Sequence, residues 1–446
     1  MERPITREWT TKPLKFAFEG DVLICVVGAT CGKINLGADC AIGRSVAAIR
    51  PNRAVDQHFL YRYLMTKVGD LRSGATGSAQ GVISREALAE VEIPLAPLSA
   101  QQRIVKKLDA LFSRTARARD DLDRIPALVS CYKQALLAAA FRGDLTADWR
   151  IENEVPPVDL ANIERQRQEA WQMEPRSPSR YTPSEDIDWR PTIDLPASWR
   201  WASVGQLTFL VQYGSSAKTH AEKSNGIPVL RMGNIVDGKI DYSQMKYLPG
   251  SHDEFPVLLL QDGDLLFNRT NSAELVGKTA IYGGPNDAMS FASYLIRLKV
   301  VGFIPDLLAA YINSPIGRSW IASTVTQQVG QANVNGSKLK TLGVPVMPPP
   351  EQVELWHRIS NAFTEIDRLT NEAASARRLL DRLDQAVLAK AFRGELVPQD
   401  PADEPASVLL ERIRVERAAA LEGNRRGRRG TREFGRRPGS LRVGRV

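Results

Sequence analysis

The longest regular pattern of apolar and polar positions runs from Glu351 to Gly394. Apolar or small residues recur there at alternating steps of four and three, which is a heptad seam that needs a partner helix to be buried. As a helix this stretch would be about 65 Å long at a rise of 1.5 Å per residue. The seam positions are Leu355, Ile359, Ala362, Ile366, Leu369, Ala373, Ala376, Leu380, Leu383 and Val387.

The same pattern occurs earlier, from Ala100 to Gly143, at a constant shift of 251 in residue number and without a gap. Each copy alone could be an ordinary amphipathic core helix, but two copies in one register predict that the helices pair with each other. Pro126 stands where the second copy has Arg377, and it is expected to kink or break the first helix. The predicted pairing and partner-interface residues are Ile104, Leu108, Leu111, Leu122, Leu355, Ile359, Ile366, Leu369, Leu380 and Leu383.

Short strands and turns precede each long helix, with glycines and period-2 apolar alternation between them. The first region predicts strands at 21–27, 45–49 and 91–95 and a helix at 59–68. The second predicts strands at 228–232, 264–267, 278–282, 295–300 and 342–346 and a helix at 306–312. Between them, residues 144–194 are rich in Pro and Ser and predict a linker with one short helix at 158–171.

The repeat extends into these regions, because Gly20-Asp21 corresponds to Gly263-Asp264 and Gly32-Lys33 to Gly277-Lys278. The predicted fold class is therefore α+β: two mainly-β globular domains and two long antiparallel coiled-coil helices in a tandem, pseudo-two-fold repeat. The predicted parts are 1–98 (first domain), 99–143 (first helix), 144–194 (linker), 195–349 (second domain), 350–394 (second helix) and 395–446 (a C-terminal helix and tail).

The two copies differ at their starts. The second copy has the long stretch from Leu195 to Asp262 before its Gly-Asp strand, whereas the first has only Met1 to Glu19 before Gly20. Nothing in that short opening resembles Leu195-Pro-x-x-Trp199. We therefore expect the first domain to be N-terminally incomplete by about fifty residues, within the usual uncertainty of boundaries drawn from sequence.

Composition adds limits rather than a function. The net charge of +8 equals that of the Arg/Gly-rich stretch 424–446, which has nine arginines and one glutamate and is typical of a disordered tail. The four cysteines, Cys25, Cys31, Cys40 and Cys131, fit no zinc spacing, so no metal site is predicted. No signal peptide or membrane-length apolar run is present in the sequence, which predicts a cytoplasmic protein.

No catalytic signature is recognisable in the sequence. Gly28 to Lys33 has one residue too few between its glycines for a phosphate-binding loop, and no G-x-G-x-x-G, H-E-x-x-H or G-x-S-x-G motif occurs. Two similar domains on paired helices instead match the symmetric half-sites of double-stranded DNA. Polar loop residues could read base edges there, although each one could equally serve the shape of its turn. The candidates are Thr30, Lys33, Arg44, Ser78, Gln80, Asn268, Arg269, Thr270, Asn271, Lys278, Gln331 and Asn333.

The chain resembles the specificity subunits of Type I restriction–modification systems over about residues 14–400. The resemblance is carried by Gly20-Asp-Val-Leu with Gly28-Ala-Thr-Cys-Gly-Lys33, by the segment 93–109 (IPLAPLSAQQRIVKKLD), by 135–145 (ALLAAAFRGDL), by Leu195-Pro-x-x-Trp199 and by the duplication itself. The resemblance implies two target recognition domains, each reading one half of a bipartite DNA site, and helices that set the gap and bind methyltransferase subunits.

The resemblance also implies a restriction/translocase subunit as a further partner, and no catalysis and no cofactor in this chain. The partner subunits would use S-adenosylmethionine, ATP and magnesium. Three alternatives stay open from the residues: an enzyme with an unrecognised site, a coiled-coil adaptor without DNA contact, and a truncated remnant without full DNA specificity.

Overall fold

The computed structural model describes residues 9–73, 82–175, 180–221, 226–328, 331–416 and 418–419, and leaves the side chains of 326–331 undescribed. The chain divides into two compact units. Unit 1 comprises Met1–Asp123 and Ala373–Val446, and unit 2 comprises Arg124–Glu372. The boundary falls within both long helices, so each unit contains half of each.

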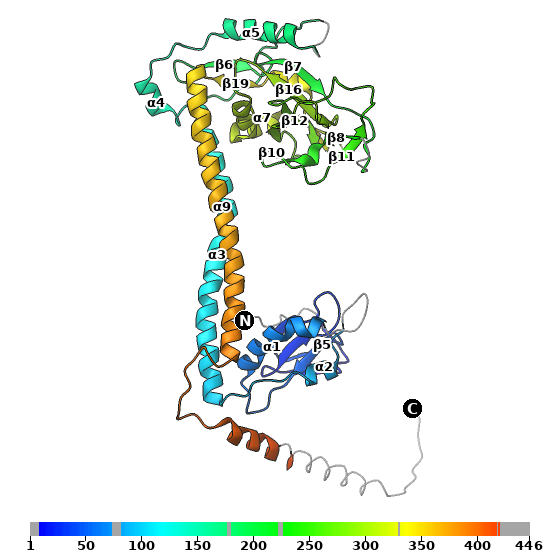
Figure 1. The fold of residues 1–446 in the computed structure, drawn as a ribbon, viewed down its shortest axis with the longest axis vertical. Helices are drawn as coiled ribbons and strands as arrows, with labels where there is room; N and C mark the ends of the chain where they lie inside the picture. Colours follow the sequence, from blue (N-terminus) through cyan, green and yellow to red (C-terminus); the bar gives the residue numbers. More distant parts are fainter. Residues whose placement is uncertain are drawn as a thin grey trace, which may run out of the picture. The chain divides into compact units, whose positions relative to one another are not determined.

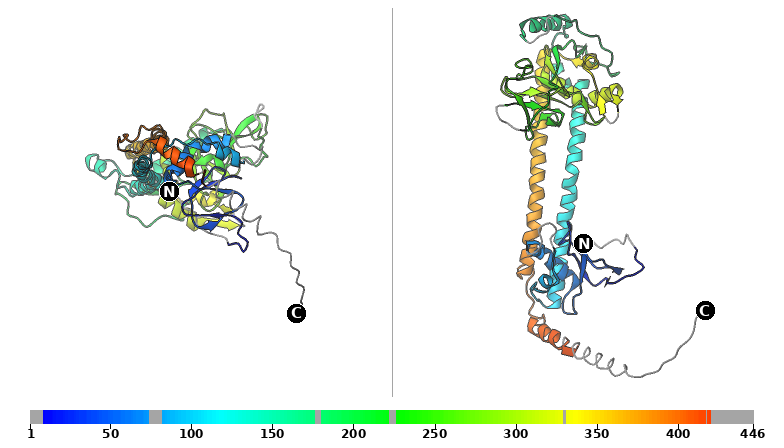
Figure 2. Two further views of the ribbon diagram at one scale, coloured as in Figure 1. Left: turned by 90° about the horizontal axis from the view of Figure 1, so that it is seen from below. Right: turned by 90° about the vertical axis from the view of Figure 1, so that its right-hand side faces the viewer.

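The long helices are α3 (Leu98–Arg142) and α9 (Pro349–Phe392), which lie side by side and antiparallel (Figures 1 and 2). Ion pairs fix the register inside each unit: Arg119–Asp381 at 2.9 Å in unit 1, and Lys133–Asp367 at 3.0 Å in unit 2. Both pairs of residue numbers have the same sum. In an antiparallel pair of helices, each step forward in one helix is a step backward in the other, so facing residues keep a constant sum of residue numbers. The two ion pairs therefore have the same register in both units.

The buried stripe follows the predicted seam at most positions. Ile104, Leu108, Leu355, Ile359 and Ile366 are buried, and Leu111, Leu122 and Leu380 are half-buried.

Two predicted pairing residues are wrong as helix-pairing positions, because Leu369 is 47% exposed and Leu383 is 48% exposed. Thr370 and Asp384 are the half-buried residues instead. Steps of four and three correspond to 3.5 residues per turn, whereas a straight helix has 3.6. At these two places the buried face of α9 therefore falls one residue later than the heptad pattern predicts.

Pro126 does not break the first helix, since α3 continues through it to Arg142. Proline removes one backbone donor and crowds the preceding turn, which costs about 3 kcal/mol in a helix interior. The ion pair Arg377–Asp123, at 2.5 Å in unit 1, joins the partner helix one turn before the proline. The predicted break is therefore wrong, whereas the predicted kink stays a prediction.

The globular part of unit 1 is built on the antiparallel sheet β3-β2-β5, with Leu23 of β2 opposite Asn35 of β3 and Ala48 of β5. Helix α1 packs against β2 and β3 and buries one face of the sheet, where Val22 and Ile24 lie. The elements are β1 (Phe16–Ala17), β2 (Val22–Cys25), β3 (Ile34–Leu36), β4 (Cys40–Ala41), β5 (Val46–Ile49), α1 (Gln57–Ser73) and α2 (Arg85–Ala89).

Unit 2 repeats this sheet and enlarges it to β14-β12-β16-β7. Helix α6 takes the place of α1, packing against β12 and β14. The shared elements and their additions are β6 (Arg200–Ser203), β7 (Thr208–Tyr213), β12 (Leu265–Asn268), β14 (Thr279–Ile281), β16 (Leu295–Val300), α6 (Pro305–Asn313), α7 (Pro315–Thr324), α8 (Gly336–Lys340) and β19 (Gly343–Val346).

The remaining strands of unit 2 form small sheets around this centre. The sheet β11-β8-β15 covers the face of the main sheet on which Leu266 lies, and β13-β18-β17 continues the loop after β12. They are β8 (Gly226–Leu230), β9 (Ile235–Val236), β10 (Lys239–Ile240), β11 (Lys246–Pro249), β13 (Thr270–Asn271), β15 (Ser290–Phe291), β17 (Thr326–Gln328) and β18 (Gln331–Asn333), with a 3-10 turn at Met232–Asn234.

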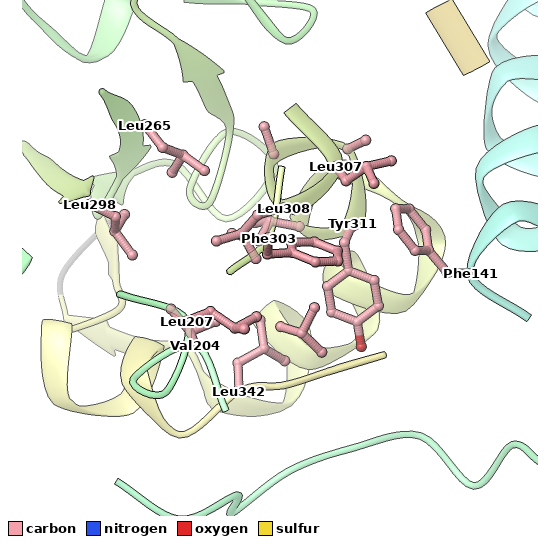
Figure 3. Packing of buried hydrophobic residues seen from close by; sticks show 14 of the residues in the cluster. Phe141, Val204, Leu207, Leu265, Leu298, Phe303, Leu307, Leu308, Tyr311 and Leu342 are labelled. Atoms are coloured by element: carbon pink, nitrogen blue, oxygen red, sulfur yellow. The ribbon is translucent and has the colours of Figure 1, made fainter. Parts of the chain in front are cut away.

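The other face of the main sheet carries the largest core of the molecule (Figure 3). Leu265 and Leu298 of the sheet contribute to it, together with Leu307, Leu308 and Tyr311 of α6. The core also includes Phe141, Leu355 and Ile359, which come from the long helices. The second domain is thus built directly onto one end of the helix pair.

Two predicted segments differ in the structure. The expected linker 144–194 packs onto unit 2: it contains α4 (Ala147–Glu152) and α5 (Leu160–Met173), and Ile163 is buried in the main core. The expected strand 91–95 does not form, although its counterpart β19 pairs with β6. A strand needs a hydrogen-bonded neighbour, and no strand of the described part of unit 1 takes the place of β6.

Candidate nucleic-acid interface and helix platform

A buried glutamine locks each domain to the start of a long helix. In unit 1 the Gln101 amide donates to the carbonyls of Ala54 (3.0 Å) and Ala96 (2.7 Å), and its oxygen accepts from the Asp56 N–H (2.8 Å). One side chain thus provides hydrogen-bond partners for backbone groups of the loop before α1 and for a carbonyl just before α3.

Unit 2 repeats this arrangement bond for bond. The Gln352 amide donates to Gly302 (3.2 Å) and Met347 (3.0 Å), and its oxygen accepts from the Ile304 N–H (2.9 Å). The sequence analysis did not single out these glutamines as functional. The signal was available, because Gln101 and Gln352 coincide under the shift that relates the two copies.

A tyrosine makes a second matched contact at each joint, that is, where a globular domain meets the start of a long helix. The Tyr63 hydroxyl donates to the Glu92 carbonyl (2.5 Å) and the Tyr311 hydroxyl to the Gly343 carbonyl (2.8 Å), and the two acceptors are again related by the repeat shift. Burial raises the pKa of Tyr311 far above its usual range. The tyrosine therefore stays protonated and remains a donor.

The far end of each long helix reaches the domain of the other copy. Phe141, at the end of α3, packs edge-on against Tyr311 with 5.0 Å between ring centroids (Figure 3). Phe392, at the end of α9, packs in the same way against Phe59 (5.2 Å) and Tyr63 (5.0 Å). Each domain therefore holds the start of one helix and the end of the other.

Both helices end in the same Schellman turn, which explains the repeated Ala-Phe-Arg-Gly. Gly143 (φ +86°) and Gly394 (φ +79°) take the left-handed conformation that glycine tolerates best. The N–H of Asp144 reaches the Ala139 carbonyl (3.0 Å), and the N–H of Glu395 reaches the Lys390 carbonyl (2.9 Å). These bonds satisfy helix-terminal carbonyls and turn the chain away from the seam.

The hairpin turn after the central strand is also shared. Gly32 (φ +85°) and Gly277 (φ +82°) close it, and a side chain at either position would collide with a neighbouring helix. Arg72 donates to the Cys31 carbonyl (2.6 Å), and Arg318 donates to the Val276 carbonyl (2.5 Å). An arginine thus fixes the turn in each domain, from α1 in one and α7 in the other.

Beside this turn in unit 2, Arg269 is held by an aromatic ring and an amide. Its guanidinium lies 4.8 Å from the centroid of the Tyr213 ring, and Nη2 approaches Asn333 Oδ1 at 3.4 Å. Asn333 in turn donates to Thr270 Oγ1 at 3.0 Å. Tyr213 and Tyr294 are 42% and 44% exposed beside them. A pre-oriented guanidinium next to exposed aromatic rings is suited to contact with nucleic-acid bases.

The other candidates of unit 2 differ in access to solvent. Asn268 is fully buried, and its amide contacts the carbonyls of Met232 and Leu275 at 3.5 Å. It is therefore corrected from a DNA contact to an interior residue, because β12 is covered on both faces. Thr270 is buried too, and Asn271 and Lys278 are half-buried. Gln331 lies on β18, but its side chain is outside the described residues.

In unit 1, Thr30, Lys33 and Arg44 are exposed and lie around the strands β2, β3 and β5. Ser78 and Gln80 fall outside the described residues. Sequence reasoning missed Tyr213, which gave no signal because it ends an ordinary strand. The structure thus gathers the second-domain candidates Arg269, Thr270 and Asn333 around that tyrosine.

Other kinds of site receive no support from the described residues. Within them, no group of three or more His, Cys, Asp or Glu side chains could hold a metal ion. The four cysteines are free thiols. No helix in the described part of the chain is both long and apolar enough to cross a membrane.

Comparison with known proteins gives a consistent family. The profile of the "Type I restriction modification DNA specificity domain" matches residues 6–125. The Type I restriction enzyme EcoKI specificity subunit of Escherichia coli (strain K12) is 26% identical over 408 residues, which cover 89% of this chain and 79% of that protein. The StySPI specificity subunit of Salmonella potsdam is 25% identical over 411 residues, with the same two shares.

These relatives are specificity subunits of Type I restriction–modification systems, and the chain is similar to them over most of its length. The fold agrees with this similarity. A chain in a structure described as "Structural basis underlying complex assembly and conformational transition of the type I R-M system" superposes with a TM-score of 0.62 at 20% identity, covering 86% of this chain and 84% of that one. The overall fold of this chain is therefore similar to the fold of that chain.

Proposed function

We propose that this specificity subunit is the non-catalytic DNA-reading component of a Type I restriction–modification complex. Each globular domain reads one half of a bipartite site in double-stranded DNA. The paired helices α3 and α9 set the gap between the halves and bind methyltransferase subunits, and a restriction/translocase subunit joins the assembly. The observation that carries the proposal is the duplicated joint, because identical bonds at Gln101 and Gln352 fix two domains in the same way on one helix pair.

The proposal assigns chemistry to the partners and recognition to this chain. Methyl transfer would use S-adenosylmethionine, and translocation and cleavage would use ATP and magnesium, all bound by the partner subunits. Base reading needs donors and acceptors held in place beside the groove, with phosphate contacts to fix the register. Arg269, braced by Tyr213 and Asn333, is the best-placed base-reading residue of the second domain.

The test exchanges one arginine in each domain. We expect Arg269→Ala to relax sequence preference in one half-site only, by about 1–3 kcal/mol of discrimination, because a bidentate arginine–guanine contact is lost. Arg44→Ala, in the exposed loop of the first domain, is the matched variant, and we expect any change it causes to fall in the other half-site. The specificity would be mapped by sequencing methylated DNA made with purified methyltransferase subunits.

Two outcomes would count against this assignment. If Arg269→Ala weakened binding equally on all sequences, the residue would contact phosphate and the base-reading role would be wrong. If the unchanged chain with its methyltransferase subunits preferred no DNA sequence, the proposed function itself would fail.

A further inference from the structure

The segment Leu195–Ser203 completes the second domain by adding a strand and a tryptophan. Its β6 pairs with β19, placing Trp201 opposite Pro345 and Arg200 opposite Val346. Trp199 is 2% exposed, and its indole N–H donates to Glu351 Oε2 at 2.8 Å. The segment therefore covers both an otherwise open strand edge and the end of the helix pair.

Pro196 of the same segment lies directly on the turn that ends α3. A Cβ added at Gly143 would be 2.6 Å from the Pro196 Cγ, so only glycine permits this approach. Under the segment, residues 343–348 are all buried. The position of the segment is thus defined by the strand edge, by Glu351 and by the glycine turn.

Unit 1 has each of these landmarks without such a segment in its described part. Residues 92–94, the counterparts of 343–345, are exposed, and Ile93 shows 36% of its surface. A groove opens beside them, lined among others by Phe59, Leu95, Ala100, Ile104, Phe392 and Gly394.

The groove lies where Trp199 and Pro196 lie in unit 2. In the repeat, Ala100 corresponds to Glu351, which accepts the hydrogen bond of the Trp199 indole. Gly394 corresponds to Gly143, which lies against Pro196. The small Ala100 leaves room at the position from which the longer Glu351 reaches its tryptophan. The structure therefore contains a filled and an open version of one binding site.

We propose that the groove of unit 1 binds an extended peptide segment of the Leu-Pro-x-x-Trp pattern. The backbone of the segment pairs with the edge at 93–95, as in other cases of strand addition, and its indole enters the groove beside Ala100. The apolar side chains of Phe59, Ile104 and Phe392 in the lining offer contact for the indole, and the glycine turn at Gly394 offers space for the proline. The proposal is independent of DNA recognition, because it rests on the two joints alone.

The experiment measures binding of a synthetic peptide with the sequence Leu195–Ser203, labelled with a fluorophore, to the full chain by fluorescence anisotropy. We expect saturable binding that weakens more than tenfold when the peptide carries Trp199→Ala, because the buried indole supplies most of the contact. We expect Ala100→Trp in the protein to abolish binding by filling the groove. Ala127→Trp, on an exposed face of α3, is the matched control and should bind normally.

A second protein variant guards against misfolding of Ala100→Trp. Ile93→Pro removes one backbone donor from the exposed edge without touching the groove, and we expect it to weaken the peptide severalfold. Binding of the peptide that survives Ala100→Trp, or no saturable binding at all, would overturn the proposal. So would a photo-crosslinker at Ile93 that joins two copies of the chain and leaves the peptide unmodified, since a second copy would then occupy the groove.

Discussion

The two globular domains agree where they meet the helices and differ on the opposite face of the sheet. At the helix side, the bonds of Gln101 and Gln352 coincide donor for donor. On the other face, unit 2 adds the sheet β11-β8-β15 and a core around Leu266, whereas the face of Leu23 in unit 1 lies outside the main cluster of that domain. The repeat therefore preserves the attachment of each domain and leaves the remaining surface free to vary.

One strand pair shows this difference at the level of single residues. The Gly-Asp turn is shared: Asp21 accepts from the Phe18 N–H and Asp264 from the Gln261 N–H, both at 2.9 Å. The strand register then places Lys299 where the first copy has Arg50, and Arg297 where it has Ala48. Arg297 is fully buried, so unit 2 contains an interior cation that unit 1 lacks at the matching position.

The largest effect is expected from removing that interior cation. Arg297 donates to the Leu259 and Val257 carbonyls at 2.7 and 2.9 Å and lies 3.3 Å from Asp264. Burial raises the pKa of Asp264 above its usual value, and the positive charge of Arg297 opposes this increase. Arg297→Met would leave these groups unpaired, and we expect a loss of about 3–5 kcal/mol in the stability of unit 2.

Tryptophan fluorescence during urea unfolding is the appropriate measurement, because seven of the eight tryptophans lie in unit 2. The matched variant is Arg50→Met in the first domain. The side chain of Arg50 is 59% exposed although its partner Asp21 is buried, so we expect a smaller loss than at Arg297, measured as hydrogen exchange of β2 and β5. Equal losses in the two domains would refute the distinction between the sheets.

The next effect concerns the helix seam. Ile366 is 6% exposed and Leu369, three residues on, is 47% exposed. We expect Ile366→Asp to destabilise unit 2 by at least about 2 kcal/mol, because it removes a buried side chain and places a carboxylate in the contact. Leu369→Asp should change stability by less than about 0.5 kcal/mol as a surface substitution. Thermal unfolding of both variants checks this prediction. A larger loss of stability in Leu369→Asp than in Ile366→Asp would show that Leu369 lies in the helix contact, as the heptad pattern predicted.

A smaller, matched pair of effects should follow from the two glutamines. Gln101→Leu and Gln352→Leu each leave one buried N–H and two carbonyls without their partner, which costs about 1–3 kcal/mol. Hydrogen exchange monitored by mass spectrometry should show faster exchange in α1 for the first variant and in α6 for the second. A clear effect at only one joint would mean that the two attachments are not energetically equivalent.

The smallest effect is a pH dependence confined to unit 1. Arg103, and after it Ser99, lower the pKa of Asp403 to about 2. Because this folded-state pKa lies below the usual value of about 3.9, the contact stabilises the fold above about pH 4 and is lost as the pH falls toward 2. We expect proteolysis by pepsin within 394–406 to accelerate over that range. Arg103→Met should remove the pH dependence; an unchanged profile would exclude the contact as its cause.

The sequence by itself determined the repeat, the paired helices and the strands that have matched partners. The constant shift between the copies, the heptad pattern and the final Ala-Phe-Arg-Gly are local and periodic features, so they are visible without coordinates. Strand β16 was predicted with its bounds at Leu295–Val300, and Ile104, Leu108, Leu355 and Ile359 are buried as expected. These features follow from periodicity and turn chemistry, which depend on neighbours in the chain.

Only the tertiary structure decided which polar residues are accessible and which strands form. Asn268 belongs to a polar run in the sequence, yet it is buried because α6 and the sheet β11-β8-β15 cover the two faces of the sheet that contains its strand. Residues 91–95 were predicted as a strand but form none, since pairing depends on a neighbour from another part of the chain. Burial and strand pairing are properties of contacts between distant segments, and no local pattern contains them.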